Sequence, residues 1–182
     1  MATPNESRNA FEEVVPPSAS ASSSNPAKKG KRVPFDVFIN HRGPDTKHTL
    51  AASIYDTLKS MGLEVFLDEP ELELGDFIPF EIQEAMTTSF LHIAILSPKY
   101  AESPWCLAEL SFMLKTGRPV IPVFYKVDPG DIRWTAKGKG VYTQAFSKHK
   151  ENGRYSLEKL EDWKVALQNV TFLTGHIVKE NE

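Results

Sequence analysis

The stretch Phe90-Leu91-His92-Ile93-Ala94-Ile95-Leu96 is nearly all apolar. This pattern is typical of a parallel β-strand that is covered on both of its faces. A second buried strand is predicted at residues 119–125, and two shorter β-rich runs at 34–40 and 64–68 predict two more. No fifth strand is evident from the sequence.

Helical patterns separate these strands. Ser103 is a candidate N-cap, and Pro104 would then occupy the first helical position, where its missing N–H group costs nothing. Gly62 follows the last periodic residue of an earlier pattern, as expected for a glycine just past a helix end. The predicted helices are those capped by Asp45 or Thr46, by Asp76 and by Ser103, and those at about 140–149 and 157–173.

Alternating strands and helices at this spacing predict a parallel sheet with right-handed crossovers. We therefore expect an α/β, flavodoxin-like three-layer sandwich, with strand order 2-1-3-4-5 and helices on both faces. In such a sheet the order reverses between the first and third strands, and ligands bind at the carboxyl ends of those strands. The loops after Ile39 and Leu96 should share one cleft, onto which the helix starting at Ser103 opens.

Composition bounds the class of protein. The 182 residues suit one domain with tails, and we predict a disordered tail at 1–32, a domain at 33–176 and a short tail at 177–182. The net charge of −3 gives no reason to expect nucleic acid as the main partner. The absence of a signal pattern and of a membrane-length apolar run favours a cytoplasmic protein without membrane contact. The basic cluster at 28–32 is interpreted as a solvated linker end rather than a nuclear address.

The first predicted loop, at residues 40–47, suits an anionic group. It brings together the cation of Arg42, the small residue Gly43 and the start of a helix. It matches neither a Walker loop nor a G-x-G-x-x-G fingerprint. A tight turn followed by a helix cap explains the same residues.

The second predicted loop leads into a helix that carries Trp105 and Glu109. These residues are four apart and share one helix face. An aromatic plane beside a carboxylate can stack a ring while the acid contacts a sugar hydroxyl. Spacing alone favours the alternative, in which Trp105 belongs to the core and Glu109 is solvated.

Other catalytic signatures are not evident. The five histidines are scattered and have no cysteine at metal-ligand spacing, so we expect no metal site. Ser97 and Ser103 lack a nucleophile elbow. Asp128 and Asp131 flank a Pro-Gly pair and are interpreted as turn formers.

Six motifs resemble a plant TIR domain in their sequence and order. They cover nearly the whole predicted domain, and the chain is similar to the TIR-only proteins of plants, those of grasses in particular. The motifs are residues 35–39 with 41–46, 72–76, 96–101, 105–110 and 123–133, which include His41-Arg42-Gly43-Pro44-Asp45-Thr46 and Trp105-Cys106-Leu107-Ala108-Glu109-Leu110.

The resemblance implies an enzyme of plant defence that cleaves NAD+ between nicotinamide and ribose. The expected products are nicotinamide with ADP-ribose or a cyclic ADP-ribose isomer, an immune signal. Glu109 matches the catalytic glutamate, and NAD+ is a substrate rather than a cofactor. The loop at 69–76 matches a mobile loop that rearranges to admit substrate. The implied NAD+-binding positions are Arg42, Gly43, Pro44, Asp45, Thr46, Lys47, Glu73, Gly75, Ser97 and Trp105.

The resemblance also implies self-association through TIR–TIR contacts. Two alternatives stay open: a non-catalytic adaptor that works by such contacts, and a TIR domain that processes nucleic acid. Three departures from the common plant pattern bear on these expectations. Asn40-His41 replaces Ser-Phe, Leu74 replaces an arginine, and Ala52-Ser53 replaces a Ser-His pair used in TIR–TIR packing.

Overall fold

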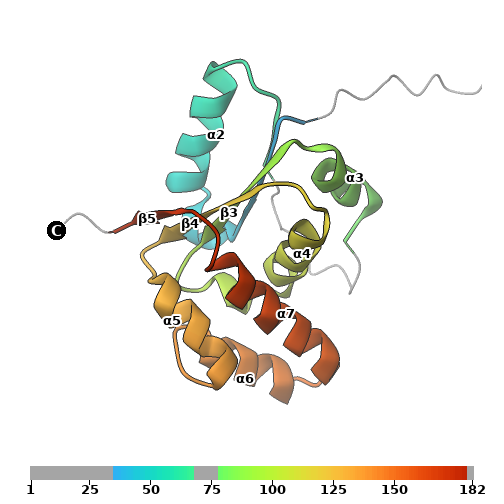
Figure 1. The fold of residues 1–182 in the computed structure, drawn as a ribbon, viewed down its shortest axis with the longest axis vertical. Coiled ribbons are helices and arrows are strands. Elements are labelled where there is room, and N and C mark those ends of the chain that lie inside the picture. Colours follow the sequence, from blue (N-terminus) through green and yellow to red (C-terminus); the bar gives the residue numbers. More distant parts are fainter. Residues whose placement is uncertain (1–34, 68–77, 180–182) are drawn as a thin grey trace, which may run out of the picture. The chain divides into compact units, whose positions relative to one another are not determined.

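The computed structural model describes residues 35–67 and 78–179. They belong to one compact unit that spans residues 33–182 (Figure 1). No helix among these described residues is long and apolar enough to cross a membrane.

A five-stranded sheet with the order β2-β1-β3-β4-β5 forms the centre of this unit, and every neighbouring pair is parallel. The predicted order is confirmed. The strands are β1 (Val37–His41), β2 (Val65–Leu67), β3 (Leu91–Leu96), β4 (Val120–Tyr125) and β5 (His176–Val178).

The fifth strand is the part of the sheet that the sequence did not reveal. β5 has only three residues and lies at the edge, where His176 and Ile177 are exposed, so it lacks a continuous buried apolar run. It pairs with β4 through residues 123–125. The predicted domain end at residue 176 falls inside this strand, and the sheet continues to Val178.

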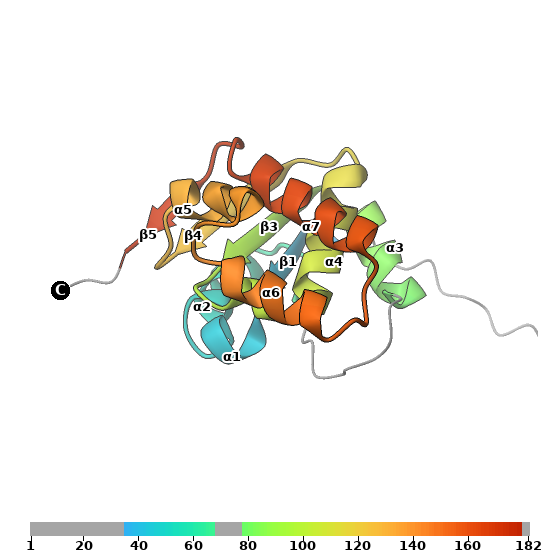
Figure 2. The ribbon, with the colours of Figure 1, turned by 90° about the horizontal axis from the view of Figure 1, so that it is seen from below.

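The two faces of the sheet carry different helices, as alternation of side chains along a strand requires. Val37 and Ile39 of β1 pack toward α2 (Leu50–Ser60) on one face. Phe38 packs toward α3 (Phe80–Thr88) and α4 (Pro104–Lys115) on the other. Figures 1 and 2 show α2 and α4 on opposite sides of the strands. The predicted three-layer sandwich is confirmed.

The predicted first helix is divided in two. Residues 43–46 form the short helix α1 (Gly43–Thr46), and α2 begins only at Leu50, after Thr49. Neither Asp45 nor Thr46 caps the long helix, because both side chains bond elsewhere. The predicted end of α2 is correct: Gly62 follows its C-cap with a φ of 85°, a left-handed conformation that favours glycine.

The remaining predicted helices occur in the predicted order, and the structure adds one short α-helix and two 3-10 helices. Ser103 caps α4 by accepting a hydrogen bond from the Cys106 backbone N–H at 3.3 Å, as predicted. Asp128 also acts as an N-cap, of a short helix that we had interpreted as a turn. The elements not yet given are η1 (Tyr100–Glu102), α5 (Pro129–Trp134), η2 (Thr135–Lys137), α6 (Thr143–Glu151) and α7 (Leu157–Val170).

Helix α4 is fixed on two sides. Leu107, Leu110 and Met113 are fully buried in the larger core cluster. On another side, Asp162 of α7 accepts hydrogen bonds from the Ser111 hydroxyl at 2.6 Å and from the Lys115 ammonium group at 2.9 Å. Burial raises the pKa of Asp162, but these bonds and the nearby positive charge outweigh it and hold that pKa below its usual value. The carboxylate therefore stays ionised and ties α4 to α7.

Candidate functional site

The loops after β1 and β3 meet at the predicted switch point of the sheet. The Ser97 hydroxyl, directly after β3, donates a hydrogen bond to Asp45 of α1 at 2.5 Å. The Arg42 guanidinium, directly after β1, donates to Glu102 of η1 at 3.2 Å. These contacts confirm that the two loops converge beside the start of α4.

Glu109 lies at this point and is only 1% exposed. It is in the second turn of α4, between the buried residues Cys106 and Leu110. The alternative that spacing favoured, a solvated Glu109, is therefore wrong. Its neighbour on the helix face, Trp105, is half-buried rather than part of the core.

The Glu109 carboxylate belongs to a buried polar cluster formed by Asn40, Tyr100 and Glu109, hereafter the buried cluster. The Asn40 side-chain amide donates to the Glu109 Oε2 at 2.7 Å. The Tyr100 hydroxyl donates to the Asn40 Oδ1 and also lies 2.9 Å from the Cys106 carbonyl oxygen. Asn40 and Tyr100 are both 0% exposed. Three segments distant in sequence, β1, η1 and α4, thus place a carboxylate inside the protein.

Strand geometry explains why Asn40 reaches α4. Asn40 is two residues after Phe38, so the two side chains lie on the same face of the sheet. Phe38 belongs to the core cluster that includes α4. The last same-face position of β1 is therefore polar and points toward the second turn of that helix.

Two buried tyrosines remain neutral hydrogen-bond donors beside this cluster. Burial is the main cause that raises the pKa of Tyr100 well above its usual value, and nearby Cys106 and Glu109 raise it further. Burial likewise raises the pKa of Tyr142, with a contribution from Asp45. The Tyr142 hydroxyl donates to the Ser97 carbonyl oxygen at 2.7 Å, which fixes the loop after β3.

A second group of side chains, hereafter the charged rim, consists of Arg42, Asp45 and Glu102. The Arg42 Nη1 lies 2.5 Å from the Asp45 Oδ1, and its Nη2 lies 3.2 Å from the Glu102 Oε2. The side chains are partly exposed, from 13% for Asp45 to 41% for Glu102. The rim therefore offers a solvent-reachable cation that is balanced by two carboxylates.

The other predicted positions in the first loop differ in their exposure and in their hydrogen bonds. A Cβ atom at Gly43 would meet no atom within 4 Å, so the space beside its backbone is open. Pro44 is exposed and Lys47 half-buried. Thr46 is buried, and its hydroxyl lies 2.9 Å from the His41 Nδ1 and donates to the Arg42 carbonyl oxygen. Its side chain is thus occupied inside the protein.

Two predicted positions, Glu73 and Gly75, lie outside the described residues, as does the loop at 69–76. The predicted Asp76 cap is wrong, because α3 begins at Phe80 with Pro79 at its N-cap position. Within the described ranges, no three histidine, cysteine or acidic side chains are grouped so that they could hold a metal ion. The structure adds two residues that sequence reasoning did not select, Asn40 and Tyr100. The signal for Asn40 was a polar residue at a same-face position of a buried strand.

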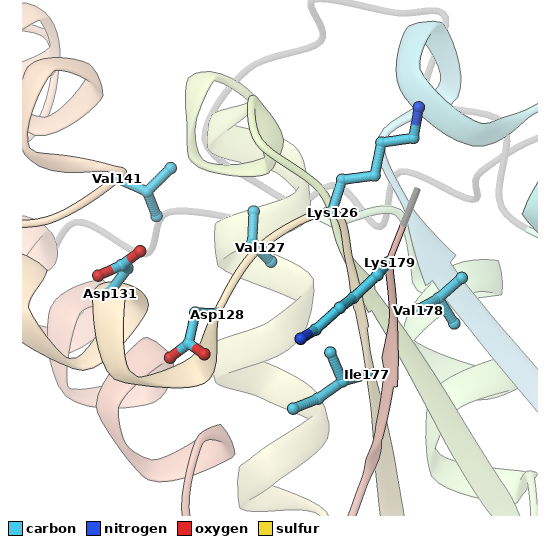
Figure 3. Close-up of a pocket in the computed structure, with 8 residues that line it drawn as sticks. All are labelled: Lys126, Val127, Asp128, Asp131, Val141, Ile177, Val178 and Lys179. Carbon is cyan, nitrogen blue, oxygen red and sulfur yellow. The ribbon is translucent and has the colours of Figure 1, made fainter. Parts of the chain in front are cut away.

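A pocket of about 350 Å³ lies elsewhere along the carboxyl edge of the sheet (Figure 3). It is lined by the segment after β4 and by β5 with the residue that follows it, and its charged groups are Lys126, Asp128, Asp131 and Lys179. Of the predicted site residues that the structure describes, none lines it. The candidate site at the switch point is therefore separate from this pocket.

Fold and site together define a doubly wound α/β domain with a buried carboxylate and a cationic rim at its switch point. The TIR domain family model matches residues 34–182. The chain belongs to the TIR domain family.

Similar proteins come from plant immunity. The chain is 35% identical to the TMV resistance protein N of Nicotiana glutinosa over 161 residues, which are 86% of this chain and 13% of that protein. It is 41% identical to the probable 2' cyclic ADP-D-ribose synthase BdTIR of Brachypodium distachyon over 98 residues, 54% of this chain and 44% of that protein. The chain thus matches less than half of the length of each relative.

A solved structure shares the fold. The TIR domains in the activated Roq1 resistosome that recognises the effector XopQ match with a TM-score of 0.70 and 35% identity. The match covers 79% of this chain and 87% of that chain. The resemblance to plant TIR domains is confirmed by the family model, the relatives and this structure.

Proposed function

We propose that this protein is an NAD+ nucleosidase that cleaves the nicotinamide–ribose bond, with Glu109 as its catalytic residue. The observation that carries the proposal is the Glu109 carboxylate, buried at the switch point and held by the Asn40 amide at 2.7 Å. A relative named as a probable 2' cyclic ADP-D-ribose synthase supports the substrate class.

Cleavage of this bond requires a negatively charged group near the ribose and does not require a general acid. When the C–N bond breaks, its electron pair goes to the pyridinium nitrogen, so nicotinamide leaves as a neutral molecule. Positive charge develops at the ribose C1′, as in other glycoside cleavages, and a nearby carboxylate stabilises it. Attack by water, with loss of a proton, gives ADP-ribose. Attack by a group of the same molecule gives a cyclic isomer.

The charged rim supplies the complementary group for the anionic half of the substrate. The two phosphates of a dinucleotide suit the planar guanidinium of Arg42, which forms paired hydrogen bonds with such oxygens. The open space beside Gly43 leaves room for a phosphate near the backbone. In this account Glu109 acts on the ribose and Arg42 binds the pyrophosphate.

The burial of Glu109 has a consequence for the reaction. A carboxylate that is 1% exposed cannot contact a ribose without movement of the groups that cover it. We therefore propose that catalysis requires a rearrangement, coupled to self-association through TIR–TIR contacts. The match to the TIR domains of a resistosome supports such association. Activity should then rise more than linearly with protein concentration, and strictly proportional activity from a monomer would contradict this part.

Mass spectrometry of the products formed from NAD+ tests the function. Wild-type protein should release nicotinamide together with ADP-ribose or a cyclic isomer, whereas Glu109→Ala should do so about 10²–10³-fold more slowly. Glu151→Ala is the control, because it removes an exposed glutamate at the end of α6. Equal nicotinamide release by wild type and Glu109→Ala would refute the assignment.

A non-catalytic adaptor is the second candidate, and the resistosome match is the observation that favours it. The adaptor hypothesis predicts that signalling survives Glu109→Ala and fails when exposed helix surfaces are disrupted. The nucleosidase hypothesis predicts that signalling is lost in Glu109→Ala.

A further inference from the structure

We propose that Asn40 is a positioning residue for the Glu109 carboxylate, and that Tyr100 sets the orientation of the Asn40 amide. The effect on reaction rate rests on the proposed function.

The contact between Asn40 and Glu109 is short and buried. The Asn40 Nδ2 lies 2.7 Å from the Glu109 Oε2, and both side chains are at most 1% exposed. A hydrogen bond donated to a carboxylate is electrostatically stronger inside a protein than in water. Asn40 therefore supports the negative charge that a developing cation at C1′ requires.

The orientation of the Asn40 side-chain amide decides whether it can donate to Glu109. An asparagine could present either its NH2 group or its oxygen to Glu109. The oxygen would place two acceptors 2.7 Å apart. In the structure the Tyr100 hydroxyl donates to the Asn40 Oδ1, and the NH2 group faces Glu109. Burial keeps Tyr100 protonated, which preserves this donor.

The three residues of the buried cluster come from three different elements. Asn40 is in β1, Tyr100 in η1 and Glu109 in α4. Tyr100 is further fixed to α4 by its contact with the Cys106 carbonyl oxygen at 2.9 Å. The carboxylate is thus held relative to the sheet and to the loop after β3. A small displacement of a reacting group can cost up to about 100-fold in rate.

Steady-state kinetics test the consequence for the reaction. Asn40→Leu removes the donor with little change in volume and should lower kcat about 10- to 100-fold, with KM for NAD+ changed by no more than about threefold. Tyr100→Phe should cause a smaller loss of the same kind. Val170→Ala, which lowers packing in α7 away from the site, is the control and should lower the melting temperature without changing kcat.

Thermal unfolding tests the contact independently of any activity. Asn40→Leu should lower the melting temperature, because it leaves a buried carboxylate without its donor. Adding Glu109→Leu removes the stranded carboxylate, so the double variant should unfold at a higher temperature than Asn40→Leu alone. Melting temperatures that shift additively would overturn the contact, and a wild-type kcat in Asn40→Leu would overturn its role in positioning Glu109.

The two measurements separate the two proposals. If the wild-type protein released no nicotinamide, the proposed nucleosidase function would fail. The thermal cycle would still decide the inference, because coupled shifts support a bond between Asn40 and Glu109 and additive shifts refute it.

Discussion

The buried cluster and the charged rim both lie at the carboxyl ends of β1 and β3, yet they differ in their exposure to solvent. Asn40, Tyr100 and Glu109 are at most 1% exposed and are joined by short hydrogen bonds. The side chains of the charged rim are 13–41% exposed, and Arg42 contacts Asp45 at 2.5 Å and Glu102 at 3.2 Å. One region is buried, and the other is partly exposed to solvent.

This difference predicts a division of labour. Charges in a dry, fixed environment interact strongly and need no reorganisation during a reaction, which suits a group that stabilises a transition state. Charges near solvent interact more weakly and can exchange partners, which suits the reversible binding of a charged substrate. Changes in the buried cluster should therefore affect kcat, and changes in the charged rim should affect KM.

The largest expected effect on the charged rim is that of Arg42→Ala. A hydrogen bond to a charged group contributes about 1.5–3 kcal/mol, so the KM for NAD+ should rise about 10- to 100-fold while kcat changes little. The measurement is initial rate against NAD+ concentration. Lys148→Ala, which removes an exposed cation on α6, is the control. A lower kcat with an unchanged KM would contradict the claim that the charged rim acts in substrate binding and the buried cluster in catalysis.

A smaller effect of opposite sign is expected from Glu102→Gln. This change removes the carboxylate that competes with substrate phosphates for Arg42, at 3.2 Å. Partly exposed ion pairs contribute about 0.2–1 kcal/mol, so KM should fall by no more than about fivefold. The same titration of initial rates detects this change. An increased KM would show that Glu102 assists binding rather than competing with it.

The smallest expected effect on the site is that of a buried polar residue far from the switch point. His92 lies near the amino end of β3 and is fully buried. Burial is the main cause that lowers its pKa from 6.5, although its bond to the Met86 carbonyl oxygen opposes this and Arg118 adds to it. The folded state therefore binds fewer protons than the unfolded state, and stability should be lost as the pH falls below about 6.5.

Melting temperatures measured between about pH 7 and pH 5 check this sign. The decline should be shallower in His92→Gln than in wild type, while kcat at neutral pH should stay unchanged. His48→Gln is the control, because His48 is exposed. If the melting temperature of His92→Gln fell as steeply with pH as that of wild type, His92 would not be the cause of the loss of stability at low pH. A large loss of kcat would show that burial alone, rather than position at the switch point, determines the effect.

The architecture was predictable because long apolar strands and their turn residues are local signals. The alternation of four apolar strands with helical patterns, and the flavodoxin-like fold that such spacing favours, were sufficient for the order of the first four strands. β5 was missed because a three-residue exposed edge strand has no such signal. α5 was missed because Pro129-Gly130 reads as a turn, although Asp128 caps the helix there.

The candidate site was predictable only in outline. Topology and motif resemblance together selected Glu109 and the first loop. The burial of Glu109 was not predictable, because it depends on contacts across 69 residues to Asn40, and the Asn40–Tyr100 bond spans 60 residues. Pattern within a helix cannot reveal a hydrogen bond to a distant strand. The division of this polar region into the buried cluster and the partly exposed charged rim was therefore visible only in the structure.

The most direct test of the account is the rate of nicotinamide release at saturating NAD+ by Glu109→Gln. Glutamine keeps the size of the side chain and can still accept the hydrogen bond from Asn40, but it lacks the negative charge. The account predicts a kcat about 10²–10³-fold below that of wild type, with a similar KM and a folded protein. A kcat equal to that of wild type would contradict the claim that the buried charge of Glu109 carries the reaction.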